Sequence, residues 1–206
     1  MTSVSLAIGR PTLADRLFAR GVVMDVVLVA AGAALTAIAA QVQVPLWPVP
    51  ITGQTLAVLL VGSALGALRG ALSMILYVVL GIAGLPVFSE ATSGIAIVLG
   101  PTGGYIIGFV FAAAFTGWIA QRSWDRRILR AILSFLGGVV VTFAFGLPWL
   151  AITLGLTWDQ ALEGGLYPFI PGGVIKMLIA AVVVAVAWKH VEREDRRRAE
   201  AELSDS

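Results

Sequence analysis

The chain has 206 residues, of which 59% are hydrophobic and only 13% are charged. Soluble domains are about half apolar and about a quarter charged, so this composition excludes an ordinary soluble protein and predicts an all-α, polytopic membrane protein. Cysteine is absent and His190 is the single histidine, so no disulfide framework, thiol nucleophile or Cys/His metal centre is expected. The net charge of +2 is small, and the basic residues lie in loops and tails, which is typical of membrane topology and not of nucleic-acid binding.

A helix needs about 20 mostly apolar residues to cross a bilayer, and fewer where loops dip inward. Six stretches come close to this length, near residues 22–41, 53–68, 70–85, 104–121, 129–155 and 173–190. Only a tight turn at 67–70 separates the second stretch from the third. We therefore expect an N-terminal segment (1–21), one membrane domain with six transmembrane helices (22–190), and a charged tail (191–206) that extends the last helix. No signal-peptide cleavage site is expected before the first span.

The basic residues of the loops and tails gather on one side of these six spans. They are Arg10, Arg16, Arg20, Arg69, Arg122, Arg126, Arg127, Arg130, Lys189, Arg193, Arg196, Arg197 and Arg198. The charged residues of the opposite loops are acidic: Glu90, Asp159 and Glu163. The positive-inside rule then predicts a multi-pass protein of the cell membrane with both termini in the cytoplasm. Asp25, near the cytoplasmic end of the first span, is expected to be an interfacial charge or a partner of Arg20.

The first span carries small residues at helical spacing, namely Ala30, Ala33, Ala34 and Ala37. A stripe of small residues lets another helix approach closely. It serves either packing within the protein or docking onto another membrane subunit.

The first outer loop, QVQVPLWPVPITGQ, contains three prolines that make it a rigid extended cap. It carries Leu46 and Trp47 where a freely solvated loop would be polar. Trp47 is therefore either an aromatic anchor at the membrane surface or part of a lid over a cavity.

The second outer loop is too long and too apolar for a simple connection, and a short helix is expected near 93–99. Its end brings Thr102, Gly103, Gly104 and Tyr105 to the start of the fourth span. Backbone N–H groups at a helix start favour an anion or a carbonyl oxygen, whereas glycines there also serve close helix packing. Both roles stay open, and the spacing of a phosphate loop is absent.

The third outer loop ends at Tyr167 and the prolines that follow it, shortly before Lys176. A lysine in a membrane segment costs roughly 2.5–3.5 kcal/mol on insertion scales and is usually functional. Lys176 either snorkels to the outer surface or projects into a cavity, where Gly173 and Ala180 on its helix face would leave room for a ligand.

Further polar residues in the spans fit a cavity that opens outward. Thr52, Gln54 and Thr55 begin the second span, and Ser73 and Tyr77 lie one turn apart on the third. Each of them is also a candidate for a hydrogen bond between helices. Gln54 is the strongest ligand candidate, because its amide both donates and accepts hydrogen bonds.

Four segments, VPITGQTLAVLLVG, GIAGLPVF, GPTGGYIIGF and YPFIPGGVIK, occur in this order. Together they resemble the BioY family, the biotin-binding S components of energy-coupling factor (ECF) transporters. The resemblance implies a six-helix protein that captures biotin from outside. It also implies an ECF module as partner, made of a membrane coupling protein and two cytoplasmic ATPases, although some BioY proteins are thought to act without it. The stripe of the first span resembles the surface that S components present to the coupling protein.

The implied site takes biotin as its ligand and needs no cofactor and no metal. We expect it to comprise Trp47, Thr52, Gln54, Tyr77, Phe88, Glu90, Thr102, Gly103, Gly104, Tyr105, Tyr167 and Lys176, with the partner docking at Ala30, Ala33, Ala34 and Ala37. Lys176 is expected to contact a polar end of biotin, the carboxylate being electrostatically the simplest. The family pattern is P-G-D-x-x-K, but here Gly173 stands at the acidic position, and Glu90 is the candidate substitute.

Two alternatives stay close to this interpretation: an S component for a different vitamin, and a solitary biotin transporter. An intramembrane enzyme is not expected, because the spans lack converging acids, bases or metal ligands. No nucleotide-binding motif is present either, so binding is the activity that the chain performs by itself.

Overall fold

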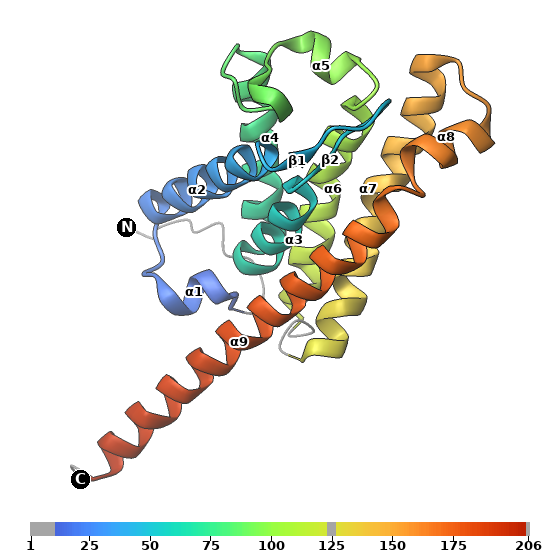
Figure 1. The fold of residues 1–206 in the computed structure, drawn as a ribbon. Helices are drawn as coiled ribbons and strands as arrows, with labels where there is room; N and C mark the ends of the chain where they lie inside the picture. Colours follow the sequence, from blue (N-terminus) through green and yellow to red (C-terminus); the bar gives the residue numbers. More distant parts are fainter. Residues whose placement is uncertain (1–10, 123–126, 205–206) are drawn as a thin grey trace.

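The computed structural model describes residues 11–122 and 127–204, and it is mainly helical as expected (Figure 1). The helices are α1 (Leu13–Leu17), α2 (Val22–Ala40), α3 (Gln54–Leu65), α4 (Ala67–Ile82), α5 (Ile95–Leu99), α6 (Gly103–Ala120), α7 (Ile128–Leu154), α8 (Trp158–Gly165) and α9 (Phe169–Ser204), with a 3-10 turn, η1, at Ser89–Ala91. Arg10 and Arg126, two of the residues used to predict orientation, lie outside the described residues, as does the side chain of Arg198.

Among the residues that the structure describes, the helices α2, α6, α7 and α9 are long and apolar enough to cross a membrane. The apolar helices α3 and α4 are shorter, with 12 and 16 residues. At 1.5 Å per residue they extend over about 18 and 24 Å. Together these six helices occupy the positions of the six expected spans.

The expected turn at 67–70 is wrong, because α3 ends and α4 begins at Gly66 alone. Gly66 has a φ of 90°, which glycine adopts readily and other residues do not. Its N–H donates to the carbonyl oxygen of Gly62, and its own carbonyl accepts from the N–H of Gly70. One residue therefore suffices to redirect the chain between the two helices.

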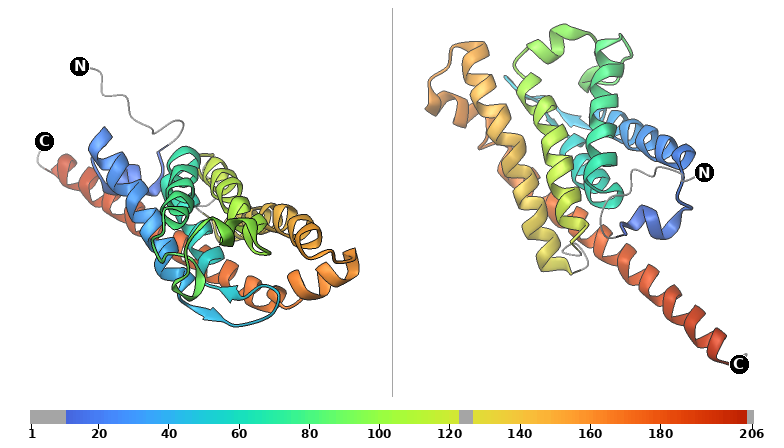
Figure 2. Two further views of the ribbon diagram at one scale, coloured as in Figure 1. Left: turned by 90° about the horizontal axis from the view of Figure 1, so that it is seen from above. Right: turned by 180° about the vertical axis from the view of Figure 1, so that it is seen from behind.

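The centre of the bundle is α6, which packs against α3, α4 and α7 (Figures 1 and 2). In addition, α2 packs against α3 and α4, while α9 packs against α3 and α7. Small residues permit these close approaches: a Cβ atom at Gly62 of α3 would lie 2.6 Å from the carbonyl oxygen of Ala113 on α6. The helices are thereby held tightly below the site described next.

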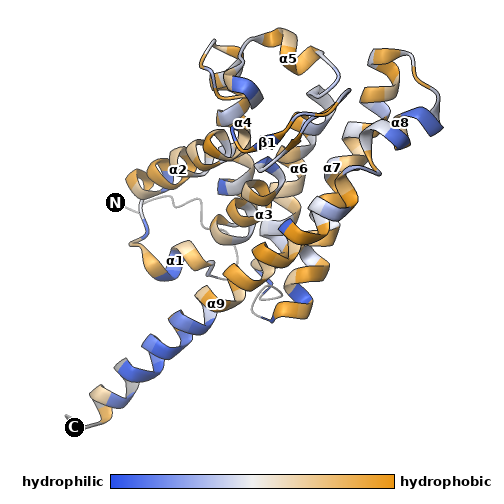
Figure 3. Ribbon diagram, in the orientation of Figure 1, coloured by the Kyte–Doolittle hydropathy of each residue, from blue (hydrophilic) through white to orange (hydrophobic). Residues whose placement is uncertain are grey.

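Apolar side chains cover the outward faces of the long helices. Val23 on α2, Leu129 on α7 and Ile152 on α7 are 80%, 70% and 82% exposed. Figure 3 shows the hydrophobic character of α2 and of the first part of α9, and the hydrophilic character of the end of α9. Apolar faces of this extent on span-length helices are typical of contact with lipid, so the chain is a membrane protein.

An antiparallel hairpin departs from a purely α-helical fold. Strand β1 (Gln43–Val44) pairs with β2 (Ile51–Thr52), with Gln43 opposite Thr52. The N–H of Gly53 also donates to the carbonyl oxygen of Val42, over 2.8 Å. The prolines predicted an extended loop, but they gave no sign that its two ends pair.

Two helices lie in segments for which the sequence predicted none. Helix α8 begins with a capping box, in which Thr157 Oγ1 accepts from the N–H of Gln160 and Gln160 Oε1 accepts from the N–H of Thr157. Helix α1 begins in the same way with Thr12 and Asp15. The three-residue spacing of each pair was the overlooked signal. The short helix expected near 93–99 is confirmed as α5.

Arg69 is buried and not exposed in a loop, because it bridges two buried carboxylates. Its guanidinium lies 2.9 Å from Asp15 and forms a second ion pair with Asp25, and all three side chains are 2% exposed. Asp25 thus pairs with Arg69, whereas Arg20, its expected partner, lies 3.7 Å from Asp15. Burial raises the pKa of Asp15, but hydrogen bonds from Thr12 and Arg69 outweigh this and hold its pKa below the ordinary 3.8. Asp15 therefore stays ionised at neutral pH.

Candidate functional site

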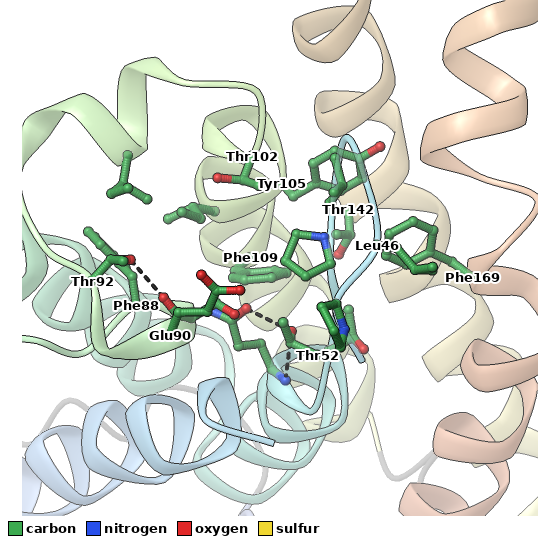
Figure 4. A pocket seen from close by; sticks show the side chains of 18 of the residues that line it. Leu46, Thr52, Phe88, Glu90, Thr92, Thr102, Tyr105, Phe109, Thr142 and Phe169 are labelled. Atoms are coloured by element: carbon green, nitrogen blue, oxygen red, sulfur yellow. Dashed lines mark hydrogen bonds between the residues drawn. The ribbon is translucent and has the colours of Figure 1, made fainter. Parts of the chain in front are cut away.

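A cavity of about 240 Å³ lies next to the hairpin (Figure 4). Its walls come from the hairpin, the start of α3, the connection between α4 and α5, and parts of α6, α7 and α9. Most of the lining is apolar, with a few hydroxyl, amide and charged groups, as in most small-molecule sites.

Seven of the twelve expected site residues line this cavity. They are Thr52, Gln54, Phe88, Glu90, Thr102, Tyr105 and Lys176. The other five lie outside its lining: Trp47, Tyr77, Gly103, Gly104 and Tyr167.

Lys176 projects from α9 into the cavity and is held there by neutral oxygen atoms. Its Nζ donates to the backbone carbonyl of Thr52 over 2.6 Å and lies 3.3 Å from Oγ1 of Thr55. No carboxylate of residues 11–122 and 127–204 forms an ion pair with it. The ammonium group is half-buried and can bind an anionic ligand group without first breaking an ion pair within this part of the chain.

Gln54 is oriented by the hydroxyl groups on either side of it. Thr52 Oγ1 donates to Gln54 Oε1 over 2.7 Å, and Gln54 Nε2 donates to the Tyr77 hydroxyl over 2.6 Å. Tyr77 is completely buried on α4. It therefore acts through Gln54 and does not reach the cavity itself.

Aromatic rings form the apolar walls. Tyr105, Phe143 and Phe169 pack together, with ring centroids 5.6 to 6.3 Å apart, and bring α6, α7 and α9 into contact. The Tyr105 hydroxyl donates to the carbonyl oxygen of Gly165 over 2.9 Å. Phe88 meets Tyr77 edge-on at 5.4 Å. These contacts fix the shape of the cavity.

Of the two roles left open for the glycines that begin α6, the structure supports helix packing. A Cβ atom at Gly103 would collide with the carbonyl group of Val98, and one at Gly104 would lie 2.6 Å from the carbonyl oxygen of Phe145. Thr102, directly before them, does line the cavity. Trp47 is 81% exposed on the hairpin loop, and Tyr167 is 54% exposed before α9.

Sequence reasoning missed several lining residues, including Ile106, Phe109, Thr142, Phe143 and Phe169. A signal existed for two of them. Ile106 and Phe109 follow Thr102 and Tyr105 at helical spacing, so they share one face of α6. Phe143 of α7 and Phe169 of α9 offered no such signal, because apolar side chains there fit lipid contact equally well.

The small-residue stripe of α2 divides between two faces. Ala33 is buried and Ala37 packs against the same core, whereas Ala30 and Ala34 are exposed. Gly173 lines a different, apolar groove of about 470 Å³ between α7 and α9. It contributes nothing to the cavity that holds Lys176.

A model of the BioY family matches residues 10–193. The chain belongs to the BioY family. The BioY protein described as "Probable biotin transporter BioY" of Pyrococcus horikoshii is 48% identical over 93 residues, which are 45% of this chain and 57% of that protein. "Biotin transporter BioY2" of Lactococcus lactis is 43% identical over 91 residues, 44% of this chain and 50% of that protein.

The chain spans about half the length of these curated BioY relatives in the matched segments. A crystal structure described as the S-component for biotin from an ECF-type ABC transporter matches more completely. It superimposes with a TM-score of 0.73 at 28% identity, over 81% of this chain and 92% of that chain. The BioY relatives are transporters and not enzymes.

Proposed function

We propose that the chain is the biotin-binding S component of an ECF-type transporter and takes part in biotin uptake. The cavity carries this proposal, because a BioY-family chain here presents one lysine and a few amide and hydroxyl groups within apolar walls. Biotin has the matching chemistry: an apolar bicycle, a ureido head and a carboxylate on an apolar chain.

The contacts within the cavity follow from this chemistry. The Lys176 ammonium binds the carboxylate, since this is the strongest electrostatic pairing that the cavity offers. The Gln54 amide, held by Tyr77, binds a polar group of the ligand, and Phe88 and Tyr105 pack against its apolar body. Trp47, exposed on the hairpin loop, belongs to a lid that closes over the bound ligand.

We assign six transmembrane spans to α2, α3, α4, α6, α7 and α9, with both termini in the cytoplasm. The charge distribution supports this orientation. Helix α1, the end of α6 and the start of α7 lie at the end of the bundle opposite the hairpin and α5 (Figure 1), and Arg16, Arg122 and Arg127 belong to or directly flank these segments. By the positive-inside rule that end faces the cytoplasm, and the cavity then faces outward.

A coupling protein and two ATPases supply the energy in this proposal. The chain has no nucleotide-binding motif of its own, and the exposed Ala30 and Ala34 on α2 offer a surface that a membrane partner can approach closely. Affinity purification from membranes tests this assignment. Recovery of the chain without a coupling protein, together with biotin uptake by cells that lack ECF ATPases, would favour the solitary-transporter alternative.

A ligand panel on detergent-purified protein tests the binding function. Saturable binding of biotin at nanomolar concentration, with other vitamins far weaker, is the expected result. Tight binding of another vitamin in place of biotin would support the alternative S component.

A further inference from the structure

Glu90 has an unfavourable backbone conformation in the cavity wall. Its φ of 59° and ψ of 30° lie in the left-handed region, and Ala91 follows with a φ of 52°. Side-chain-bearing residues rarely adopt this conformation. Where they do, the surrounding structure holds them, and such residues cluster at functional sites.

The turn around Glu90 is fixed by one hydrogen bond across it and by two hydrogen bonds with Gln41. The N–H of Phe88 donates to the carbonyl oxygen of Thr92 over 3.1 Å. The N–H of Ala91 donates to Oε1 of Gln41 over 3.0 Å, and Nε2 of Gln41 donates to the carbonyl oxygen of Phe88 over 3.0 Å. The end of α2 thus clamps the turn in its left-handed form.

This turn places the Glu90 side chain in the cavity lining (Figure 4). Its carboxylate makes no hydrogen bond or ion pair with any residue that the structure describes. Among the described residues that line the cavity, Glu90 is the only acid and Lys176 the only base. Lys176 bonds to Thr52 and Thr55 instead. The cavity therefore holds one negatively charged group that accepts hydrogen bonds and one positively charged group that donates them, and the two form no ion pair with each other.

We infer that Glu90 is a specificity-determining residue whose carboxylate accepts the N–H donors of a cyclic urea head group, while Lys176 serves the ligand's carboxylate. The inference rests on the proposed function and deepens it. A carboxylate only accepts hydrogen bonds, so it favours a head group with two N–H donors and rejects one that offers only acceptors. It favours a cationic head group still more, because a bond with charge on both sides is stronger.

The experiment compares biotin with 2-iminobiotin, in which a cyclic guanidinium replaces the cyclic urea. Dissociation constants are measured by calorimetry at neutral pH for the wild-type full chain, for Glu90→Gln and for Ala91→Gly as the matched control. We expect Glu90→Gln to weaken the binding of biotin by about tenfold and the binding of 2-iminobiotin by a further tenfold or more. The reason is that a charge-assisted hydrogen bond is about twice as strong as a neutral one. Ala91→Gly relaxes the same turn, keeps the carboxylate and should leave both constants unchanged.

A fourth variant, Glu90→Gly, separates binding from folding. Glycine adopts a positive φ without strain, so Glu90→Gly should melt at the same temperature as the wild type or higher, yet bind biotin more weakly. If the wild type binds biotin but Glu90→Gln leaves the ratio of the dissociation constants for biotin and 2-iminobiotin unchanged, the role of Glu90 is overturned and the proposed function stands. If the wild type binds neither ligand, both fail.

Discussion

At the scale of single residues, the state of Lys176 decides how the cavity binds. The ammonium group sits among neutral oxygen atoms in a mostly apolar space. A partly desolvated charge in such a place is costly unless a ligand compensates it. A carboxylate arriving at the cavity would meet a donor already positioned by Thr52 and Thr55, so little ordering remains to be done on binding.

Substituting Lys176→Met keeps much of the side chain's length and removes the charge. Because a hydrogen bond to a charged group contributes about 1.5–3 kcal/mol, we expect biotin affinity to fall about 10- to 150-fold. Biotin methyl ester lacks the carboxylate charge, so the same substitution should reduce its affinity far less. An equal loss for acid and ester, measured by equilibrium binding, would contradict the proposed pairing.

Single residues were predicted best where their chemistry is out of place in a membrane segment. Lys176 and Gln54 were found from the sequence because polar groups are costly there, whereas Glu90, in an outer loop, was named only as a substitute for the acid that the family resemblance implies at Gly173. All three line the cavity. Gly103 and Gly104 were mistaken for lining because exposed N–H groups and close helix packing call for the same residue. Tyr77 was found as a polar residue, but its burial behind Gln54 depends on how α3 and α4 pack.

At the scale of elements, a buried charge cluster joins the ends of three helices. Arg69 at the start of α4 links Asp15 on α1 to Asp25 on α2. The N–H of Thr12 also donates to the Asp15 carboxylate. Removing one member of such a cluster leaves a buried charge without compensation. The cluster thus ties α1 against the spans at the end of the bundle opposite the hairpin.

Arg69→Met should therefore destabilise the protein by about 3–5 kcal/mol, because two buried carboxylates lose their partner. Arg197→Ala is the matched control, since its pair with Glu194 is exposed on α9 and such pairs contribute about 0–1 kcal/mol. Thermal unfolding in detergent measures both. Similar melting temperatures for the two variants would show that the cluster adds little to stability.

The positions of the helices followed from hydropathy, but their ends and short neighbours did not. The chain turns between α3 and α4 at Gly66 alone, because its positive φ redirects the backbone within one residue. The apolar residues on both sides of Gly66 gave no sign of this turn in the sequence. The hairpin was missed because proline-rich segments are weak strand formers. Helices α1 and α8 were missed although their capping pairs stand in the sequence.

At the scale of the whole molecule, the cavity combines segments that are distant along the chain. Lys176 meets Thr52 across 124 residues, and Tyr105 packs against Phe143 and Phe169. The family resemblance indicated which segments matter, but only the fold shows that the hairpin and the turn at Glu90 close the same space. Because loops at one end of the bundle contribute part of the lining, changes in these loops can alter the site without altering the spans.

Binding of biotin within this cavity can be tested with a variant that fills the space. Ile97 on α5 lines the cavity and is partly exposed, so Ile97→Trp should fill the space without disrupting the bundle. At a biotin concentration about 100 times the dissociation constant, bound ligand should stabilise the wild type by about 2.7 kcal/mol. We expect biotin to raise the melting temperature of the wild type clearly and to leave that of a folded Ile97→Trp variant unchanged. An equal rise in both proteins would show that biotin binds outside this cavity.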